Sequence, residues 1–562
     1  MTDLEKKLKD LGEEAKRKGF DQPPPKTNGK KLTVSDFETL IKVSRKAKKD
    51  RDRTVDTVVR QLEETDNILP KISRPLVQEV FDRKRDIPNS KAGKLLRLIE
   101  DIEFYKDDAG EAWCIIDGEF IKVDSTKFKR YLQREFLYEY DDTPYSQALK
   151  DVIDQAEARA FFEGKTVNVP IRVAKVDGKI IVDHITDTVT IDKDGWHVGS
   201  DVSFYRPKGM KPLPMPSEDE ADVMRVEKYL NAKNKRVVRL KISALTSWLN
   251  PDIASPIVIN QGESGTAKST DARMLRSVID PSVVALGTPP RNERDLAIDA
   301  NKSGIICLDN LSGCPPWLSD ALCRICTGTA FTTRKLHTDE GRKILQMQKD
   351  IILNGIDDVA TRGDLRNRSM VFTLPKIDQS DKIEEDKLNK QFRKDHPVIL
   401  AGLYDAISAG LRADDPKIGQ LPRMADYMKW VTKCETGLPW DAGTLIDDFN
   451  KNQKNAIEAG LDGDYLAVAI REILSNTGWY KAEPTVFVEK LRSVSSESNK
   501  QYMPTVRTLK KRLRRLGDSL RAIGINWDYQ KSTRREYIIY KDGANLPDDF
   551  GTGNDNVDEA PF

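Results

Sequence analysis

The sequence predicts a multidomain α/β protein whose core carries a phosphate-binding loop between a buried strand and a helix. A loop of small residues, 262–269, separates an apolar run at 256–260 from a helix-compatible segment at 270–279. Two further apolar runs, 304–310 and 350–355, each end near a polar residue. A basic amphipathic helix at 505–523 precedes two strand-like segments. Short apolar runs bounded by turn residues indicate buried strands, so these runs are expected to share one sheet.

The loop has the composition that binds the phosphates of a nucleotide. In such loops backbone N–H groups and the helix N-terminus face the phosphates, a lysine reaches the β/γ-phosphates, and a hydroxyl ligates Mg²⁺. The lysine is Lys268 and the hydroxyl is that of Ser269, so ATP and Mg²⁺ are the expected cofactors. Ala267 replaces the usual second glycine, which is acceptable if that residue needs no positive φ. The expected nucleotide-binding residues are Gly262, Glu263, Ser264, Gly265, Thr266, Ala267, Lys268, Ser269 and Thr270.

Composition places this loop in a large protein without membrane spans. A chain of 562 residues corresponds to about three to five domains. Charged residues make up 32% of the chain but the net charge is only +2, so basic and acidic surfaces must be segregated locally. No apolar run approaches the roughly eighteen residues of a membrane span. The start carries no apolar signal segment, and six cysteines fit a reduced, cytoplasmic protein.

Changes in composition divide the chain into six predicted regions. Four prolines within 207–216 mark one boundary, and Asp177-Gly178 predicts a tight turn between two strands. Strands are expected at 112–116, 167–176, 179–183 and 188–191, and helices at 126–138, 144–160 and 218–249. The regions are a charged helical segment (1–100), an α+β module (101–217), the nucleotide-binding core (218–380), a helical lid (381–455), a C-terminal domain (456–545) and an acidic tail (546–562).

The second apolar run predicts the magnesium site. Asp309 ends this strand and can hold the ion through water beside the phosphate loop. The next residue is Asn310, where most ATPases of this kind have a glutamate that acts as the base. Either another acid polarises the attacking water or turnover is slow. The candidate acids are Glu263, Glu293 and Asp320.

The third run and the residues after it complete the predicted site. Asn354 can orient the attacking water, although an asparagine there can also be a simple cap. Three arginines, Arg362, Arg366 and Arg368, precede a fourth strand at 369–374. An arginine at the edge of an ATPase domain can reach a neighbouring subunit's γ-phosphate, and ordinary surface charge is the alternative.

The order of these motifs resembles that of the AAA+ ATPases, and in particular the superfamily 3-like and MCM-like self-loading helicases of phages and mobile elements. The matching phrases lie at 262–269, 308–312, 317–324, 354–358 and 362–365. The resemblance implies an ATP-dependent DNA helicase or replication-initiation ATPase in the cytoplasm of a bacterial host. It also implies a homo-oligomeric ring, expected to be a hexamer, with an arginine acting between subunits and Arg423 of the lid contacting nucleotide. Asp-Asn replaces the acidic pair throughout the resembled group. A DNA-binding regulatory or defence ATPase, or a helicase loader, is the alternative.

A predicted β-hairpin at 330–348 is the first candidate DNA-binding element. Its two β-prone arms flank a glycine-containing turn, and helicases of the resembled type carry a hairpin there that projects into the ring channel. The basic residues near its tip would contact single-stranded DNA through backbone phosphates. Asp339 and Glu340 at the turn weaken this interpretation, and a solvated edge hairpin is the alternative. The candidates are Arg334, Lys335, His337, Arg342 and Lys343.

The C-terminal domain is the second candidate. Helices expected at 464–474, 485–492 and 505–523, followed by a two-stranded wing at 525–540, predict a winged-helix domain whose last helix lies on duplex DNA. Four leucines of that helix fall on one face, and basic residues occupy the other. The predicted contacts are Arg507, Lys510, Lys511, Arg514 and Arg515.

Two remaining features have competing interpretations. Cys323 and Cys326 have the spacing of zinc ligands, but they also lie on an amphipathic helix where both would be buried, and the core interpretation is favoured. The tail has five acidic and no basic residues and ends in Pro561-Phe562. The tail resembles the acidic tip of bacterial single-strand-binding proteins, which implies that it docks replication proteins through Phe562. A disordered tail that only aids solubility is the alternative.

Overall fold

The computed structural model describes residues 90–328, 331–334, 342–345, 347–356, 359–419, 421–531 and 535–546. The helices predicted within 1–89 and the acidic tail from residue 547 onward, including Phe562, lie outside these residues. The chain forms two compact units, 1–102 with 124–158, and 103–123 with 159–562. Within the described ranges, no helix is long and apolar enough to cross a membrane.

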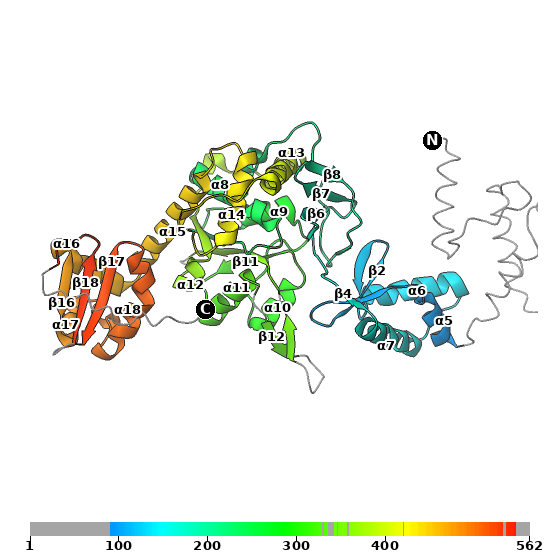
Figure 1. Ribbon diagram of the computed structural model, residues 1–562, viewed down its shortest axis with the longest axis horizontal. Helices are drawn as coiled ribbons and strands as arrows, with labels where there is room; N and C mark the ends of the chain where they lie inside the picture. Colours follow the sequence, from blue (N-terminus) through cyan, green and yellow to red (C-terminus); the bar gives the residue numbers. More distant parts are fainter. Residues whose placement is uncertain are drawn as a thin grey trace, which may run out of the picture. The chain divides into compact units, whose positions relative to one another are not determined.

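The described part of the first unit is helical. It contains α5 (Lys91–Leu98), α6 (Thr126–Tyr140) and most of α7 (Ser146–Phe162), which confirms the helices predicted at 126–138 and 144–160 (Figure 1). Serine hydroxyls cap the first two helices, because Ser90 accepts from the backbone N–H of Gly93 and Ser125 from that of Phe128.

Two sheets, one mixed and one antiparallel, occupy the first part of the second unit. One has the order β4-β1-β2-β3-β9 and the other the order β5-β6-β7-β8. Their strands are β1 (Phe104–Lys106), β2 (Ala112–Ile116), β3 (Glu119–Lys122), β4 (Lys165–Thr166), β5 (Val173–Val176), β6 (Lys179–Asp183), β7 (Thr188–Asp192), β8 (Gly195–Val198) and β9 (Phe204–Tyr205).

Three of the four strands predicted in this region are confirmed, and the fourth is too long. The predicted strand 167–176 is a β-strand only over its last four residues, because Pro170 has no N–H for a ladder and Arg172 has a φ of 64°. The predicted turn is confirmed, since Asp177 and Gly178 have φ values of 50° and 76° between β5 and β6.

A four-stranded parallel sheet forms the centre of the core. Its order is β11-β14-β10-β15, and every neighbouring pair is parallel. The strands are β10 (Ile257–Gln261), β11 (Ile305–Leu311), β14 (Asp350–Gly355) and β15 (Ser369–Thr373). Most of their residues are buried, as expected for a parallel sheet covered on both faces. The polar ends of β10, β11 and β14 therefore meet at one edge.

The prediction of one helix over 218–249 is wrong for the first half of that segment. A 3₁₀ helix, η1 (Val223–Tyr229), is followed by a break and then by α8 (Lys235–Trp248). The break is fixed by Asn231, whose side-chain amide donates to the carbonyl oxygens of Thr266 and Pro375 at 2.8 and 2.7 Å. The remaining core helices are α9 (Lys268–Ile279), α10 (Glu293–Ala300), α11 (Pro316–Cys326) and α12 (Gly363–Arg366). Cys323 and Cys326 of α11 are buried, which confirms the core interpretation of this pair.

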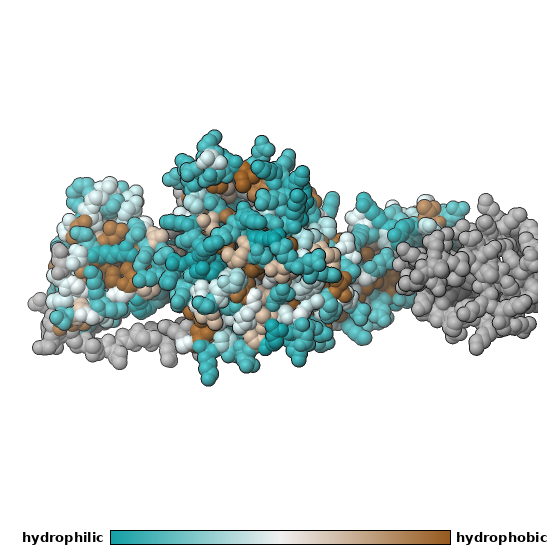
Figure 2. All heavy atoms as spheres, turned by 90° about the horizontal axis from the view of Figure 1, so that it is seen from above, coloured by the Kyte–Doolittle hydropathy of each residue, from teal (hydrophilic) through white to brown (hydrophobic). Residues whose placement is uncertain are grey.

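Helices predicted for the lid are present and pack against the core. They are α13 (Glu385–Arg412), α14 (Ala425–Cys434) and α15 (Thr444–Asp462), the last of which continues across the predicted boundary at 455. Short 3₁₀ turns lie at η2 (Gln379–Asp381) and η3 (Glu435–Gly437). Buried residues of β6 and β7 belong to the same hydrophobic core as α13 (Figure 1). Hydrophilic side chains cover much of the face seen in Figure 2.

The C-terminal domain has a separate hydrophobic core and the element order helix, strand, helix, helix, strand, strand. Its antiparallel sheet has the order β16-β18-β17. The sequence did not predict β16, because its four residues are all half-buried and show no alternation. The elements are α16 (Tyr465–Thr477), β16 (Trp479–Ala482), α17 (Pro484–Val494), η4 (Lys500–Tyr502), α18 (Val506–Arg521), β17 (Ile525–Lys531) and β18 (Arg535–Lys541).

Candidate functional site: a nucleotide-binding edge of the parallel sheet

The loop between β10 and α9 has the backbone of a close-approach turn. Gly262 and Gly265 have φ values of 148° and 86°, which L side chains rarely adopt. A Cβ atom at Gly262 would lie 3.1 Å from the carbonyl oxygen of Leu374, a tight contact that would require the chain after β15 to shift slightly. The loop then enters α9 at Lys268. The N-terminus of α9 therefore opens at the edge where β10 ends.

Ala267 has a left-handed backbone, with φ and ψ of 51° and 33°. The condition under which an alanine is acceptable here, that the residue needs no positive φ, is therefore not met. For an L-residue this conformation costs about 1–2 kcal/mol, because Cβ approaches the following carbonyl oxygen. The loop thus retains the backbone that a glycine would supply and carries the strain of an alanine.

Replacing this alanine should stabilise the protein. We expect Ala267→Gly to raise the free energy of unfolding by about 0.5–1 kcal/mol, since relief of strain exceeds the entropy that glycine adds to the unfolded chain. Urea unfolding followed by tryptophan fluorescence measures the change. Gly265→Ala is the reverse control: its new Cβ would meet nothing within 4 Å, so strain alone should destabilise the protein by about 1 kcal/mol. A destabilised Ala267→Gly variant would contradict this account.

Four of the predicted site residues come together at this edge. The Ser269 hydroxyl donates to Oδ2 of Asp309 at 2.7 Å, and Nδ2 of Asn354 donates to Oδ1 of the same carboxylate at 3.0 Å. Nδ2 of Asn354 also reaches the carbonyl oxygen of Lys268 at 3.3 Å. The ammonium of Lys268 donates to the carbonyl oxygens of Gly262 and Glu263 at 2.6 and 2.8 Å. A hydroxyl and a carboxylate, the oxygen ligands that Mg²⁺ prefers, are therefore adjacent to a lysine held by the loop.

The backbone conformation at Asn310 gives a reason why this position carries an asparagine and not the glutamate that is usual in ATPases of this kind. The pairing of β11 with β14 shifts register between Leu308 and Leu311, and Asn310 lies in this bulge with a φ of 58°. Asparagine tolerates the left-handed region better than glutamate does. The side chain is exposed. The local backbone thus favours asparagine, and β11 presents one carboxylate, that of Asp309, at the site.

Two of the three alternative acids are engaged in ion pairs. Glu293 pairs with Arg324 at 2.7 Å, and Asp320 pairs with Arg362 at 2.9 Å. Glu263 is an exposed residue of the loop itself. The described contacts therefore join none of these acids to the Ser269–Asp309–Asn354 cluster, and no base is identified by geometry.

The predicted arginines differ in their surroundings. Arg366 is buried and donates to the carbonyl oxygen of Thr361 at 3.3 Å. Arg368 and Arg423 both pair with the carboxylate of Asp364, the latter at 2.9 Å. The guanidinium groups favour the charged carboxylate, so the pKa of Asp364 is lowered despite its partial burial. Arg423 therefore contacts α12 in this structure.

The two candidate DNA-binding elements are described to different extents. The hairpin is present as β12 (Phe331–Arg334) and β13 (Arg342–Leu345), an antiparallel pair in which Arg334 lies opposite Arg342 and Thr333 opposite Lys343. Lys335 and His337 lie outside the described residues. The predicted hairpin is thus confirmed for the backbone of its two arms.

Helix α18 has the predicted amphipathic pattern. Leu509, Leu513 and Leu520 are fully buried, and a reciprocal capping box of Thr505 and Thr508 starts the helix. Lys510 lies 4.4 Å from the ring centre of Tyr529 on β17. Five basic side chains of the helix are exposed, and the four within 507–515 form what we call the basic stripe, namely those of Arg507, Lys511, Arg514 and Arg515.

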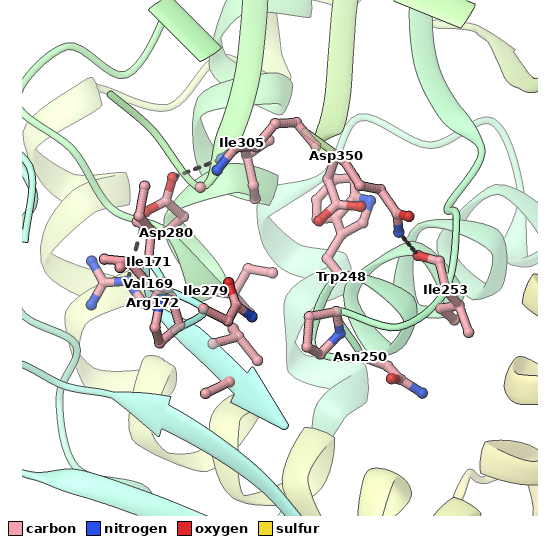
Figure 3. Close-up of a pocket in the computed structure, with 18 residues that line it drawn as sticks. Val169, Ile171, Arg172, Trp248, Asn250, Ile253, Ile279, Asp280, Ile305 and Asp350 are labelled. Atoms are coloured by element: carbon pink, nitrogen blue, oxygen red, sulfur yellow. Dashed lines mark hydrogen bonds and ion pairs between the residues drawn. The ribbon is translucent and has the colours of Figure 1, made fainter. Parts of the chain in front are cut away.

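A cavity at the opposite edge of the same sheet is separate from this site. Its volume is about 260 Å³, and it is lined by Trp248, Arg172, Asp280 and Asp350 among others (Figure 3). Asp350 begins β14 and Ile305 begins β11, so the cavity lies where the parallel strands start. Burial raises the pKa of the Asp350 carboxyl to about 7. Lys268, Ser269, Asp309 and Asn354 lie instead at the edge where the strands end.

The sequence did not reveal the residues that support the site from inside. Asn260, Asp271 and Lys241 are fully or almost fully buried beneath it and bonded to one another. Asn260 could have been found, because it ends a buried strand as Asn354 does. Asp271 resembles an ordinary acid in the first turn of a helix, and Lys241 an ordinary charge on an amphipathic helix, so nothing marked either residue.

Comparisons with solved structures give low similarity. A structure described as an active helicase, Cch of SCCmec type IV, is 13% identical, with a TM-score of 0.42, and the match covers 78% of this chain and 92% of that chain. An apo structure of the C-terminal region of NrS-1 is 11% identical, with a TM-score of 0.37, and the match covers 80% and 98%. No curated protein matches the chain.

Family models match two successive stretches of the chain. Residues 222–445, which include the phosphate loop, Asp309, Asn354 and most of the lid, match the actinomycete integrative conjugative element replication protein. Residues 466–548, which include α18 and the sheet beside it, match the C-terminal domain of the same replication protein, RepA. Two family models thus match successive stretches of this chain, and both describe the replication protein of actinomycete integrative conjugative elements.

Proposed function

We propose that this protein is an ATP-dependent DNA helicase or replication-initiation ATPase of a mobile element, with an AAA+ P-loop core that works as a ring. The observation that carries the proposal is the meeting of Lys268, Ser269, Asp309 and Asn354 at the carboxyl edge of one parallel sheet. Phosphates placed at the N-terminus of α9 would meet backbone N–H groups and the Lys268 ammonium. The family match to a replication protein supports the same role.

The chain's own residues supply the groups that ATP-Mg²⁺ needs. Ser269 and Asp309 share a hydrogen bond at the position where a divalent cation bound to the β- and γ-phosphates would take their oxygens. The Mg²⁺ ion would neutralise charge that develops on the transferred phosphoryl group. Of the arginines near α12, Arg362 and Arg368 keep partial exposure and are the proposed residues that act on a neighbouring subunit's nucleotide.

The C-terminal domain is proposed to be a winged-helix DNA-binding domain. Its order of elements places the amphipathic helix α18 before the β17–β18 hairpin, and the basic stripe faces away from the hydrophobic core. A helix of this kind is suited to the phosphates or the major groove of duplex DNA. The β12–β13 hairpin is proposed to contact single-stranded DNA in the ring channel.

Removal of three charges from the basic stripe should weaken DNA binding in a salt-dependent way. For the triple variant Arg507→Gln, Lys511→Gln and Arg514→Gln, we expect the slope of log K against log salt concentration to fall by about one unit for each phosphate that the variant no longer neutralises. Fluorescence anisotropy of labelled duplex DNA over a salt series measures the slope. Three exposed lysines of α13, Lys387, Lys390 and Lys394, provide a matched control triple whose slope should not change. An equal change in both triples would contradict the assigned surface.

A forked-DNA assay tests the proposed function. With ATP and Mg²⁺ we expect strand displacement, no displacement with a non-hydrolysable ATP analogue, and a ring-sized assembly by sedimentation. The second candidate is a DNA-binding ATPase switch, and it is favoured by Asn310, which leaves β11 without a second carboxylate at the site. ATP-dependent assembly on DNA without strand displacement would support the switch and overturn the helicase.

A further inference from the structure

A continuous chain of buried polar side chains connects an internal ion pair to the candidate site. The ammonium of Lys241 lies 2.6 and 2.7 Å from the two carboxylate oxygens of Asp271. Nδ2 of Asn260 donates to Oδ2 of Asp271 at 3.1 Å and to Oδ1 of Asn354 at 3.2 Å. Nδ2 of Asn354 donates to Oδ1 of Asp309 at 3.0 Å. Lys241, Asn260 and Asn354 are all fully buried.

The carboxylates of Asp271 and Asp309 lie on either side of the two asparagine amides and determine which way each amide is turned. The carboxylate of Asp271, held by the Lys241 ammonium, can only accept, so Asn260 must turn its NH₂ group toward it. The second hydrogen of that NH₂ group then requires an acceptor, which is the amide oxygen of Asn354. The NH₂ group of Asn354 is thereby turned toward Asp309, which also only accepts.

The amide oxygen of Asn260 also indicates that this residue acts through its NH₂ group. Oδ1 of Asn260 is buried and has no hydrogen-bond partner in the described part of the chain. A buried unpaired oxygen is a cost that needs an explanation. Asn260 and Asn354 are direct partners in the β10–β14 ladder, so the amides extend from neighbouring strands at the same level. The function of Asn260 therefore resides in its NH₂ group.

We infer that Asn260 is a positioning residue, which holds Asn354 with its NH₂ group toward Asp309 and the phosphates and its oxygen toward the interior. This inference rests on the proposed ATPase function. It also defines what Asn354 can do: its amide oxygen is bonded to Asn260, so Asn354 acts on the nucleotide site as a donor. A donor at this point suits Asp309 or a γ-phosphate oxygen as its acceptor.

The isosteric variant Asn260→Asp tests the direction of the amide. An ionised carboxylate cannot donate to Asn354, so the Asn354 amide should turn over and present its oxygen to Asp309. At about pH 8.5 we expect kcat for ATP hydrolysis to fall about 10- to 100-fold, with KM for ATP within about threefold of the wild type. Burial and the negative charge of Asp271 raise the pKa of the introduced carboxyl, while the Lys241 ammonium opposes this. Toward pH 6 the protonated carboxyl can donate again, and the ratio of variant to wild-type kcat should rise.

A second variant keeps the inference testable if the introduced carboxyl prevents folding. Asn260→Leu has a similar volume and leaves no group that can donate or titrate. We expect it to fold, as measured by its thermal midpoint, to lose kcat to the same extent, and to show no recovery at low pH. A role in packing alone would give equal pH profiles for the two variants. Recovery confined to Asn260→Asp is the result that packing does not produce.

Failure of this inference can be separated from failure of the proposed function. If the wild-type protein does not hydrolyse ATP, the proposed function is wrong and the inference falls with it. If the wild type hydrolyses ATP but Asn260→Asp keeps kcat within twofold at about pH 8.5, or loses it with no recovery at low pH, the inference alone is overturned. Binding of a fluorescent ATP analogue should be unchanged in both variants, because neither side chain replaces a residue of the phosphate loop.

Discussion

Replacing the phosphate-loop lysine by alanine, Lys268→Ala, should reduce kcat for ATP hydrolysis at least about 100-fold and abolish DNA unwinding. Residues 262–270 contain no other basic residue and include the acidic Glu263, so nothing in the loop can replace the missing charge. The loop carbonyls of Gly262 and Glu263 hold the ammonium beside the loop. Partial burial lowers the pKa of Lys268, and the Asp309 carboxylate opposes that shift.

A steady-state ATPase assay with and without DNA, together with the forked-DNA assay, measures this effect. Lys302→Ala is the matched control, because Lys302 is exposed and follows the end of α10, and its removal should leave both activities unchanged. Persistence of DNA-stimulated ATPase activity in Lys268→Ala would exclude the proposed site. Loss of unwinding with ATPase activity intact would show that the lysine acts elsewhere than on the phosphates.

The core elements of the fold could be predicted because they depend on local patterns. Apolar runs that end in Asn260, Asp309 and Asn354 became β10, β11 and β14, since a buried parallel strand needs an almost unbroken apolar sequence. The break at Asn231 could not be predicted in this way. It depends on bonds to Thr266 and Pro375, which are distant in sequence, and the intrinsic helix preference of 218–249 contains no trace of them.

The residues of the candidate site that would contact phosphate or Mg²⁺ could be predicted from the sequence. The backbone conformations and the buried residues that support them could not. Lys268, Ser269 and Asp309 belong to spacings that the chemistry of phosphate and Mg²⁺ imposes on any such loop. The left-handed backbone conformation of Ala267 and Asn310 could not be predicted from the sequence, because a positive φ at a residue other than glycine is fixed by the surrounding structure. The buried pair of Lys241 and Asp271 was hidden for a different reason, since either residue alone has the sequence pattern of a surface charge.

The same buried pair gives the largest expected effect on stability. We expect Lys241→Met to lower the free energy of unfolding by about 3–5 kcal/mol, because it leaves the Asp271 carboxylate buried without its counter-ion. Both side chains of the pair are fully buried. Two donors would remain on Asp271, the backbone N–H of Asn231 and the amide of Asn260, and these do not neutralise the charge. Burial lowers the pKa of Lys241, and the Asp271 charge opposes the shift.

Denaturant unfolding followed by tryptophan fluorescence measures the decrease, and two variants control it. Lys235 lies on the same helix with 64% of its side chain exposed, and Lys235→Met should change stability by no more than about 1 kcal/mol. Adding Asp271→Asn to Lys241→Met removes the uncompensated charge, so the double variant should be more stable than Lys241→Met alone. If the two substitutions are additive instead, the pair is not coupled. Asp271 also orients Asn260. Lys241→Met should therefore reduce ATP hydrolysis even without denaturant, where the chain remains folded. Such a loss would link the buried ion pair to ATP hydrolysis at the edge of the sheet.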